Sequence, residues 1–148
     1  MENLKNWFGF NCEIIYFYNV YGPRQICKGD MATVVGIFED HFKKKKPLPI
    51  VKPGTQTRKF THVKDTIEVC LIAWKKKKRS HYSIASPKTY SIIQLAKMFN
   101  YKTRYLPRRE GERFSSASLK MNLNNKIIRL KAKIKIKDYI KHFLEKKI

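Results

Sequence analysis

The segment IIYFYNVYGPRQ, residues 14–25, decides the fold. Its first five residues, Ile14 to Tyr18, are β-branched or aromatic, and such a run predicts a buried strand. Asn19 stands where this strand should end, and Gly22-Pro23 predicts a turn directly after it. In open α/β sheets, ligands bind just outside the carboxyl ends of the strands. Asn19 is therefore expected either to face a ligand crevice or only to cap the turn.

Capped helices alternate with short strands along the rest of the chain. Asp30, Asp65 and Ser91 each precede an apolar run and are typical N-cap residues. Gln94 would complete a capping box with Ser91. The expected strands lie at residues 13–18, 47–51, 57–63, 81–85 and 103–106, and helices are expected after each cap and at both ends of the chain. This alternation favours an α/β fold.

The helix expected after Asp65 carries a continuous apolar stripe. Ile67, Cys70, Leu71 and Trp74 stand at i, i+3, i+4 and i+7. This spacing predicts that the stripe packs on a sheet and that Cys70 is an inert core thiol. The helix expected after Asp30 has a similar stripe, made of Met31, Val34, Val35, Phe38 and Phe42.

Length and composition narrow the class of protein. A chain of 148 residues suits one modest domain, and 43% hydrophobic residues argue against disorder. No apolar run approaches the about 20 residues of a membrane helix, and the first residues lack the apolar core of a signal peptide. Cys12, Cys27 and Cys70 suit a reducing compartment and lack zinc-site spacing. We therefore expect a cytoplasmic protein without a membrane partner or a metal.

The net charge of +22 leaves two interpretations open. A basic chain can bind nucleic acid, so a basic nucleic-acid-binding module is one alternative. The two lysine runs, Lys43–Lys46 and Lys75–Lys78, however, fall where helices are expected to end. Cations there oppose the negative end of the helix dipole, which favours a solvated surface over a binding motif. A positive field would also attract a nucleotide diphosphate.

Three ordered segments resemble one enzyme family. YFYNVYGPRQ (residues 16–25), GTQTRKFTHVKD (residues 54–65) and RREGERFSSAS (residues 108–118) resemble segments of the extended short-chain dehydrogenase/reductase family. This family contains the NAD-dependent epimerases and dehydratases of nucleotide sugars, and the UDP-glucose 4-epimerases are the most similar members. The resemblance implies the C-terminal part of a Rossmann-type fold. Residues 1–25 would end the nucleotide-binding domain, and residues 26–148 would mainly form an α/β substrate-binding subdomain.

The resemblance also implies roles for individual residues. Asn19, Arg58 and Arg109 would hold the diphosphate of a nucleotide sugar, and the guanidinium fork suits phosphate oxygens. The backbone at Val51 would face the base. Glu112 would accept hydrogen bonds from the ribose hydroxyls, and the small Ser116 would widen the sugar pocket for an N-acetylated hexose. Phe17 and Tyr18 would form walls near the nicotinamide of NAD.

Two short motifs depart from the family pattern. Lys52-Pro53-Gly54 stands where the family usually has Gly-Asp-Gly, and Arg58-Lys59-Phe60 stands where it usually has Arg-Asp-aromatic. The first change could reshape a turn beside the base, and the second could reorient Arg58. Both changes are expected to affect the specificity for the ligand more than the binding of a nucleotide sugar itself.

The redox half of the family's site has no counterpart in the sequence. The six glycines, at positions 9, 22, 29, 36, 54 and 111, form no glycine-rich nucleotide turn. The family's catalytic tyrosine and the lysine four residues later would lie upstream of Met1. We therefore expect the nucleotide-sugar-binding portion of an epimerase or dehydratase, with no catalytic residues, inactive and without bound NAD when alone.

Several origins fit such a portion: a truncated or split reading frame, a chain that complements a separate N-terminal half, or a relic. A homodimer and a protein that only senses a nucleotide sugar are further alternatives.

Overall fold

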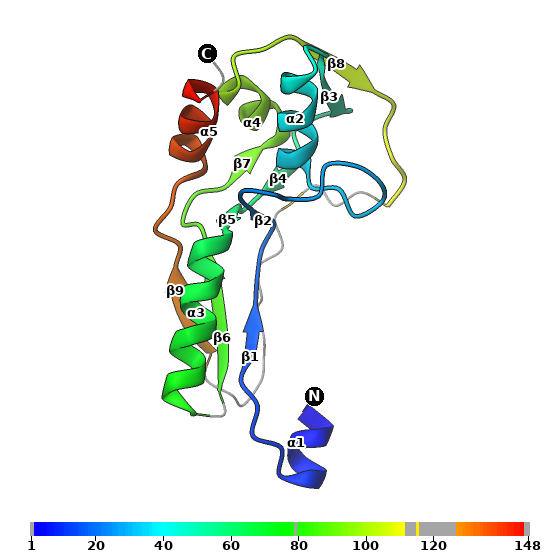
Figure 1. The fold of residues 1–148 in the computed structure, drawn as a ribbon. Coiled ribbons are helices and arrows are strands. Elements are labelled where there is room, and N and C mark those ends of the chain that lie inside the picture. Colours follow the sequence, from blue (N-terminus) through cyan, green and yellow to red (C-terminus); the bar gives the residue numbers. More distant parts are fainter. Residues whose placement is uncertain (1, 79, 112–114, 116–126, 147–148) are drawn as a thin grey trace.

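The computed structural model describes residues 2–78, 80–111, 115 and 127–146, and Figure 1 shows their arrangement. The helices are α1 (Glu2–Phe8), α2 (Val34–Lys43), α3 (Val63–Lys76), α4 (Ile92–Met98) and α5 (Ile136–Glu145). The strands are β1 (Ile14–Tyr16), β2 (Val20–Tyr21), β3 (Leu48–Val51), β4 (Thr57–Arg58), β5 (Thr61–His62), β6 (His81–Ala85), β7 (Tyr90–Ser91), β8 (Thr103–Leu106) and β9 (Ile127–Lys131). The expected α/β fold is confirmed.

A parallel three-stranded sheet in the order β1-β6-β9 forms one part of the molecule. Ile14 of β1 lies opposite His81, and His81 lies opposite Ile127 of β9. Helix α3 runs alongside this sheet in Figure 1. Its buried residues Val69 and Ala73 pack with Tyr82 and Ile84 of β6 in one hydrophobic cluster.

The other part surrounds a larger hydrophobic cluster. Helices α2, α4 and α5 gather around the parallel pair β3–β8, while β4 pairs antiparallel with β7. Buried members of this cluster include Phe38 of α2, Leu48 of β3, Leu95 of α4 and Ile140 of α5. A short parallel pair, β2–β5, lies in the chain between the two parts and carries Tyr21, whose hydroxyl donates to the carbonyl of Ile134 at 3.1 Å.

The start of α3 differs from the prediction. His62 is the N-cap, and its Nδ1 accepts from the amide of Lys64 at 3.1 Å. Asp65, the predicted cap, is 3% exposed and accepts from the amide of Ile134 at 3.0 Å. A buried carboxylate must be hydrogen-bonded, so Asp65 ties α3 to the segment before α5.

The apolar stripe predicted to pack on the sheet is instead exposed on the surface of α3. Ile67, Leu71 and Trp74 are 53%, 50% and 67% exposed, and Cys70 is only partly buried. The side chains of α3 that pack on the sheet are instead those of Val69 and Ala73. These side chains are small, which allows the helix to approach the sheet closely.

The bounds of three other elements also differ from those predicted from the sequence. The cap of α2 is Thr33, which accepts from the amide of Gly36 at 3.0 Å, and Met31 is 79% exposed. The run of residues 14–18 gives a strand of only three residues, half-buried rather than buried. The strand expected at 57–63 is divided into β4 and β5 because its two ends pair with different partners.

Helix α4 is as predicted. The amide of Gln94 donates to Oγ of Ser91 at 3.1 Å, and the amide of Ser91 donates to Oε1 of Gln94 at 2.8 Å. Strand β9 was missed, because its alternation is weak. No helix in the described part of the chain is long and apolar enough to cross a membrane.

Gly54 gives a first testable prediction. Its φ is +78°, and a Cβ there would lie 2.7 Å from Cγ2 of Ile50 and 2.8 Å from Cγ1 of Ile93. Ile50 is buried and cannot move aside easily. We expect Gly54→Ala to lower the free energy of unfolding by about 2–4 kcal/mol, from backbone strain plus overpacking.

Gly9 provides the control, because its φ is +64° but nothing lies within 4 Å of its would-be Cβ. Gly9→Ala should cost only about 1 kcal/mol, the conformational contribution. Urea denaturation of both variants measures the difference. If the two variants lose the same free energy of unfolding, Ile50 and Ile93 do not restrict the turn at Gly54.

Glu39 of α2 gives a prediction about pH. Its side chain is 8% exposed and accepts from the hydroxyl of Tyr139 at 2.7 Å. Burial raises the pKa of Glu39 above its usual value, more than its hydrogen bonds lower it. Because the folded pKa exceeds the unfolded one, the protonated form is favoured in the fold, and stability falls as the pH rises through this interval.

Glu39→Gln should therefore be more stable than the unmodified chain at pH 7. This difference in stability should become smaller as the pH falls and the Glu39 carboxyl becomes protonated in both the folded and the unfolded chain. Thermal melts between pH 4 and pH 7 measure it. A difference that grows on acidification would contradict the assigned direction.

Candidate functional site

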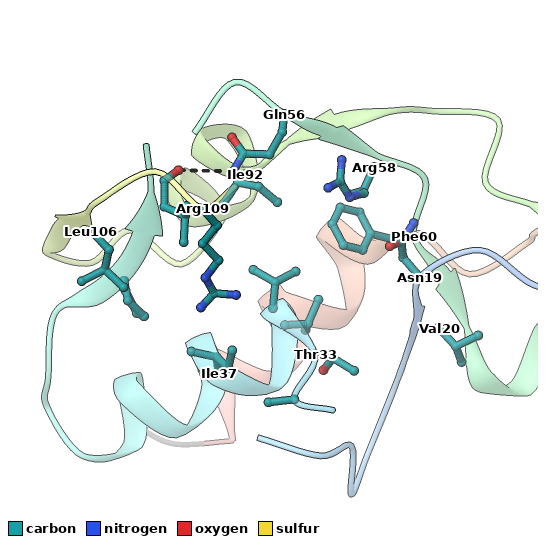
Figure 2. Close-up of a pocket in the computed structure, with 15 residues that line it drawn as sticks. Asn19, Val20, Thr33, Ile37, Gln56, Arg58, Phe60, Ile92, Leu106 and Arg109 are labelled. Atoms are coloured by element: carbon teal, nitrogen blue, oxygen red, sulfur yellow. Dashed lines mark hydrogen bonds between the residues drawn. The ribbon is translucent and has the colours of Figure 1, made fainter. Parts of the chain in front are cut away.

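A cavity of about 320 Å³ lies between the start of α2, strands β3 and β4 and the segment after β8 (Figure 2). Its lining is mostly apolar with a few polar side chains. The lining residues are Asn19, Val20, Ala32, Thr33, Val34, Val35, Ile37, Pro49, Val51, Gln56, Arg58, Phe60, Ile92, Leu106 and Arg109. Segments from across the chain thus meet at one site.

Asn19 enters this cavity from the turn after β1. Its backbone has a φ of +40°, a left-handed conformation that asparagine tolerates better than most residues. Its Nδ2 donates to the carbonyl of Lys59 at 3.0 Å, and its own carbonyl accepts from the amide of Thr61. These bonds fix Asn19 beside β4 and β5. Since the backbone of Lys59 makes the contact, the change from acid to lysine at this position leaves it intact.

Two arginines line the same cavity from different elements. Arg58 lies on β4 and donates from Nη1 to the carbonyl of Thr57 at 2.8 Å. Arg109 follows β8, and in Figure 2 its guanidinium reaches into the space above α2. Arg58 and Asn19 lie together at one side of that view. Asn19, Arg58 and Arg109 therefore all line one cavity, and their binding of a diphosphate there stays a prediction.

The N-terminus of α2 adds a third source of positive potential. Thr33 caps the helix, and Val34 and Val35 of its first turn line the cavity. The amides of a first helical turn have no acceptor within the helix and carry the positive end of its dipole. Together with two guanidinium groups, this arrangement suits a phosphate or diphosphate.

Apolar side chains form the walls. Phe60, Ile92 and Leu106 come from three separate segments, and Ile37 and Pro49 complete the surface. Gln56, 2% exposed, donates from Nε2 to the carbonyl of Val51 at 3.2 Å and so fixes the backbone of β3 at the wall. A largely apolar cleft with few convergent polar groups is typical of small-molecule sites.

The described lining contains no carboxylate, histidine, cysteine or lysine. Within the described part of the chain, no group of three or more potential metal ligands occurs either. Proton transfer needs a titratable group within hydrogen-bond reach of the reacting atom. The cavity as described can bind and orient an anion, and its own side chains offer no general acid or base.

Val51, predicted to face the base, also lines the cavity. The remaining predicted site residues lie outside this lining or outside the described residues, and their roles stay predictions. Phe17, directly after β1, is 45% exposed and is not part of the cavity lining. The hydroxyl of Tyr18 hydrogen-bonds Oγ of Ser83 at 3.2 Å, also outside the lining. Glu112 and Ser116 lie outside the described residues. Thr33 and Gln56 were missed by the sequence analysis, since an N-cap signal was assigned at Asp30 and glutamine in a turn carries no signal.

Comparisons with known proteins point to one family. The sequence model of the NAD dependent epimerase/dehydratase family matches residues 1–85. UDP-glucuronic acid decarboxylase 6 of Arabidopsis thaliana is 31% identical over 88 residues, which are 60% of this chain and 25% of that protein. The putative UDP-glucose 4-epimerase of Methanocaldococcus jannaschii is 40% identical over 70 residues, 46% of this chain and 23% of that protein.

A solved structure extends the likeness to the whole fold. The UDP-glucose 4-epimerase of Thermotoga maritima, solved with UDP-glucose, superposes with a TM-score of 0.80 at 22% identity. The match covers 99% of this chain and 50% of that one. The chain thus has a Rossmann-type epimerase fold and spans half the length of this structure, and about a quarter of the length of the curated relatives. With more than half of its residues matched, the chain belongs to the NAD-dependent epimerase/dehydratase family.

Proposed function

We propose that the chain is the nucleotide-sugar-binding part of an NAD-dependent epimerase or dehydratase, and that the cavity holds a UDP-hexose-like ligand. The observation that carries this proposal is the convergence of Asn19, Arg58 and Arg109 on one cavity at the start of α2. The diphosphate would lie between the two guanidinium groups and the first-turn amides of the helix, and Asn19 would donate to it.

The apolar walls would hold the rest of the ligand. The T. maritima structure contains UDP-glucose, and the Arabidopsis relative is named for UDP-glucuronic acid. By this likeness the base would lie against the backbone of Val51. Glu112 would accept from the ribose hydroxyls and Ser116 would border the sugar, as the family resemblance implies.

The dinucleotide cofactor does not fit this chain alone. In the described residues, no strand opens into a helix through a glycine-rich turn, and β1 is instead followed by Asn19 and the Gly22-Pro23 turn. A pyrophosphate of NAD would therefore lack its usual seat at a helix N-terminus. Phe17 and Tyr18 could at most form a wall near a nicotinamide. We propose that the chain binds nucleotide sugar without turnover when alone.

Calorimetric titration of the full chain tests the proposal. UDP-glucose and UDP should bind with similar affinity, while uridine, which lacks the diphosphate, should bind at least tenfold more weakly, because it cannot reach the arginines. Equal binding of uridine and UDP would contradict the assigned diphosphate site.

A parallel titration with a DNA duplex at two salt concentrations addresses the nucleic-acid alternative, which the comparisons do not support. Tight binding that falls steeply with salt, together with no binding of UDP, would favour that alternative and overturn the proposal. Addition of NAD to the UDP-glucose mixture should give no UDP-galactose.

A further inference from the structure

A row of polar side chains connects the start of α2 with α5 behind the cavity. The hydroxyl of Thr33, the N-cap of α2 labelled in Figure 2, donates to Oε1 of Gln25 at 2.8 Å. Further along α2, the carboxyl of Glu39 accepts from the hydroxyl of Tyr139 of α5 at 2.7 Å. Burial raises the pKa of Glu39, and the adjacent Tyr139 and Gln25 oppose this rise. Gln25 therefore lies between the helix cap and the buried carboxyl.

The orientation of the Gln25 amide follows from these two neighbours. An ionised carboxyl group only accepts hydrogen bonds, so Glu39 favours the Nε2 end of the amide on its side. Nε2 is buried and makes no hydrogen bond within the described residues, so the nearby carboxyl is the group that offsets its loss of water. Oε1 then faces Thr33, whose oxygen accepts from the amide of Gly36 at 3.0 Å and whose proton is free to donate.

Gly36 allows the segment that carries Gln25 to lie against the first turns of α2. A Cβ at Gly36 would lie 2.7 Å from the carbonyl oxygen of Ile26 and 3.0 Å from Cγ of Gln25. Glycine destabilises a helix interior, and at this position its missing side chain gives the room for the close approach. The amide of Thr33 donates to the same Ile26 carbonyl at 2.9 Å. The segment is thereby fixed on the helix, with Gln25 next to Thr33.

The hydroxyl of Thr33 controls the order of the helix start at the cavity. By accepting from the amide of Gly36, it caps the first turn of α2. The amides of Val34 and Val35, like those of any first turn, have no acceptor within the helix, and both residues line the cavity. If the Thr33 hydroxyl turned away from Gly36, the first turn would lose its cap and fray. The amides at the cavity would then lose their fixed positions.

We infer that Gln25 is a positioning residue of the cavity. Oriented by Glu39 and Tyr139, it holds Thr33 in the capping rotamer and so keeps the first-turn amides of α2 in place for an anion. Gln25 itself does not touch the ligand, because it lies outside the cavity lining and acts through Thr33. That the anion is a diphosphate rests on the proposed function.

An exchange of two side chains tests the inference by calorimetric titration of the full chain. Gln25→Leu removes the amide, and Gln25→Glu places a second carboxyl beside Glu39. Each should weaken UDP binding roughly fivefold and leave uridine binding unchanged, because uridine has no phosphate to meet the helix start. Gln25→Glu/Glu39→Gln restores one carboxyl and one amide, to which Thr33 and Tyr139 can again donate. This double variant should regain UDP affinity to within about twofold of the unmodified chain.

Gln94→Leu is the matched control for the loss of a capping glutamine. Oε1 of Gln94 accepts from the amide of Ser91 at 2.8 Å at the start of α4, and neither residue lines the cavity. This variant should lower the melting temperature without changing the ratio of UDP affinity to uridine affinity. If Gln25→Leu also leaves that ratio unchanged, Gln25 supports the fold alone and the inference is wrong.

Hydrogen exchange of the Gly36 amide, followed by NMR, measures the capping bond without any ligand. Exchange should be at least about fivefold faster in Gln25→Leu than in the unmodified chain, and slow again in Gln25→Glu/Glu39→Gln. Unchanged exchange at Gly36, or a loss of UDP affinity that the double variant does not reverse, would overturn the inference. Equal binding of UDP and uridine by the unmodified chain would refute the proposed function instead, and Gly36 exchange would still decide whether Gln25 holds Thr33.

Discussion

Replacing Arg58 and Arg109 together by alanine should weaken UDP binding roughly 100-fold or more while leaving the fold intact. Each guanidinium would donate charged hydrogen bonds to the diphosphate, and such a bond contributes about 1.5–3 kcal/mol. A factor of ten in affinity corresponds to about 1.4 kcal/mol, so the loss of two contacts gives this range. Arg109 is exposed and Arg58 is half-buried at the cavity, so neither truncation should open the hydrophobic core.

Arg104→Ala is the matched control for charge. Arg104 is an exposed residue of β8 that does not line the cavity. Its loss should change UDP affinity less than about threefold, through the general field alone. If Arg104→Ala weakens binding as much as the double variant does, the diphosphate is attracted by the net charge and not held by two specific side chains.

Phe99→Ala should lower the free energy of unfolding by about 3–5 kcal/mol, the usual cost of truncating a buried phenylalanine. Phe99 is 1% exposed, and its ring lies 5.8 Å from that of Phe38 and 6.1 Å from that of Phe143. It thereby joins α2 and α5 at the end of α4. For a chain of this length, the loss corresponds to roughly 10 °C in melting temperature.

The same variant should also weaken UDP binding, because α2 carries part of the diphosphate site and α4 carries Ile92 of the cavity wall. Phe10→Ala is the control, since Phe10 is 57% exposed and belongs to neither hydrophobic cluster. Its melting temperature should stay within about 2 °C of the unmodified chain. A small effect of Phe99→Ala would show that the cluster relaxes into the space left by the ring.

The sequence was informative where local chemistry alone determines structure. Ser91 and Gln94 cap α4 as predicted, because a capping box is satisfied within four residues of chain. Asn19, Arg58 and Arg109 could be assigned to one site only through the family resemblance, because they are 39 and 51 residues apart and periodicity does not relate them.

The wrong predictions concern residues whose surroundings are determined by tertiary packing rather than by local sequence. Asp65 looks like an N-cap in the sequence, but the backbone amide of Ile134, far along the chain, binds its carboxylate instead. The stripe through Ile67 and Trp74 has the periodicity of a buried face, yet these side chains are exposed. The smaller Val69 and Ala73 pack on the sheet instead. Periodicity identifies an apolar face without identifying the surface that it meets.

The path of the chain between the two hydrophobic clusters has a practical consequence. Ile15 belongs to the sheet cluster, Phe38 to the larger one, Val69 again to the first, Leu95 to the second, and Leu130 and Ile140 repeat the alternation. A cut between residues 38 and 130 would divide both clusters at once, whereas a cut nearer either end would separate elements of one cluster. Limited proteolysis should therefore yield either the intact polypeptide or small peptides, without an autonomous subdomain of intermediate size.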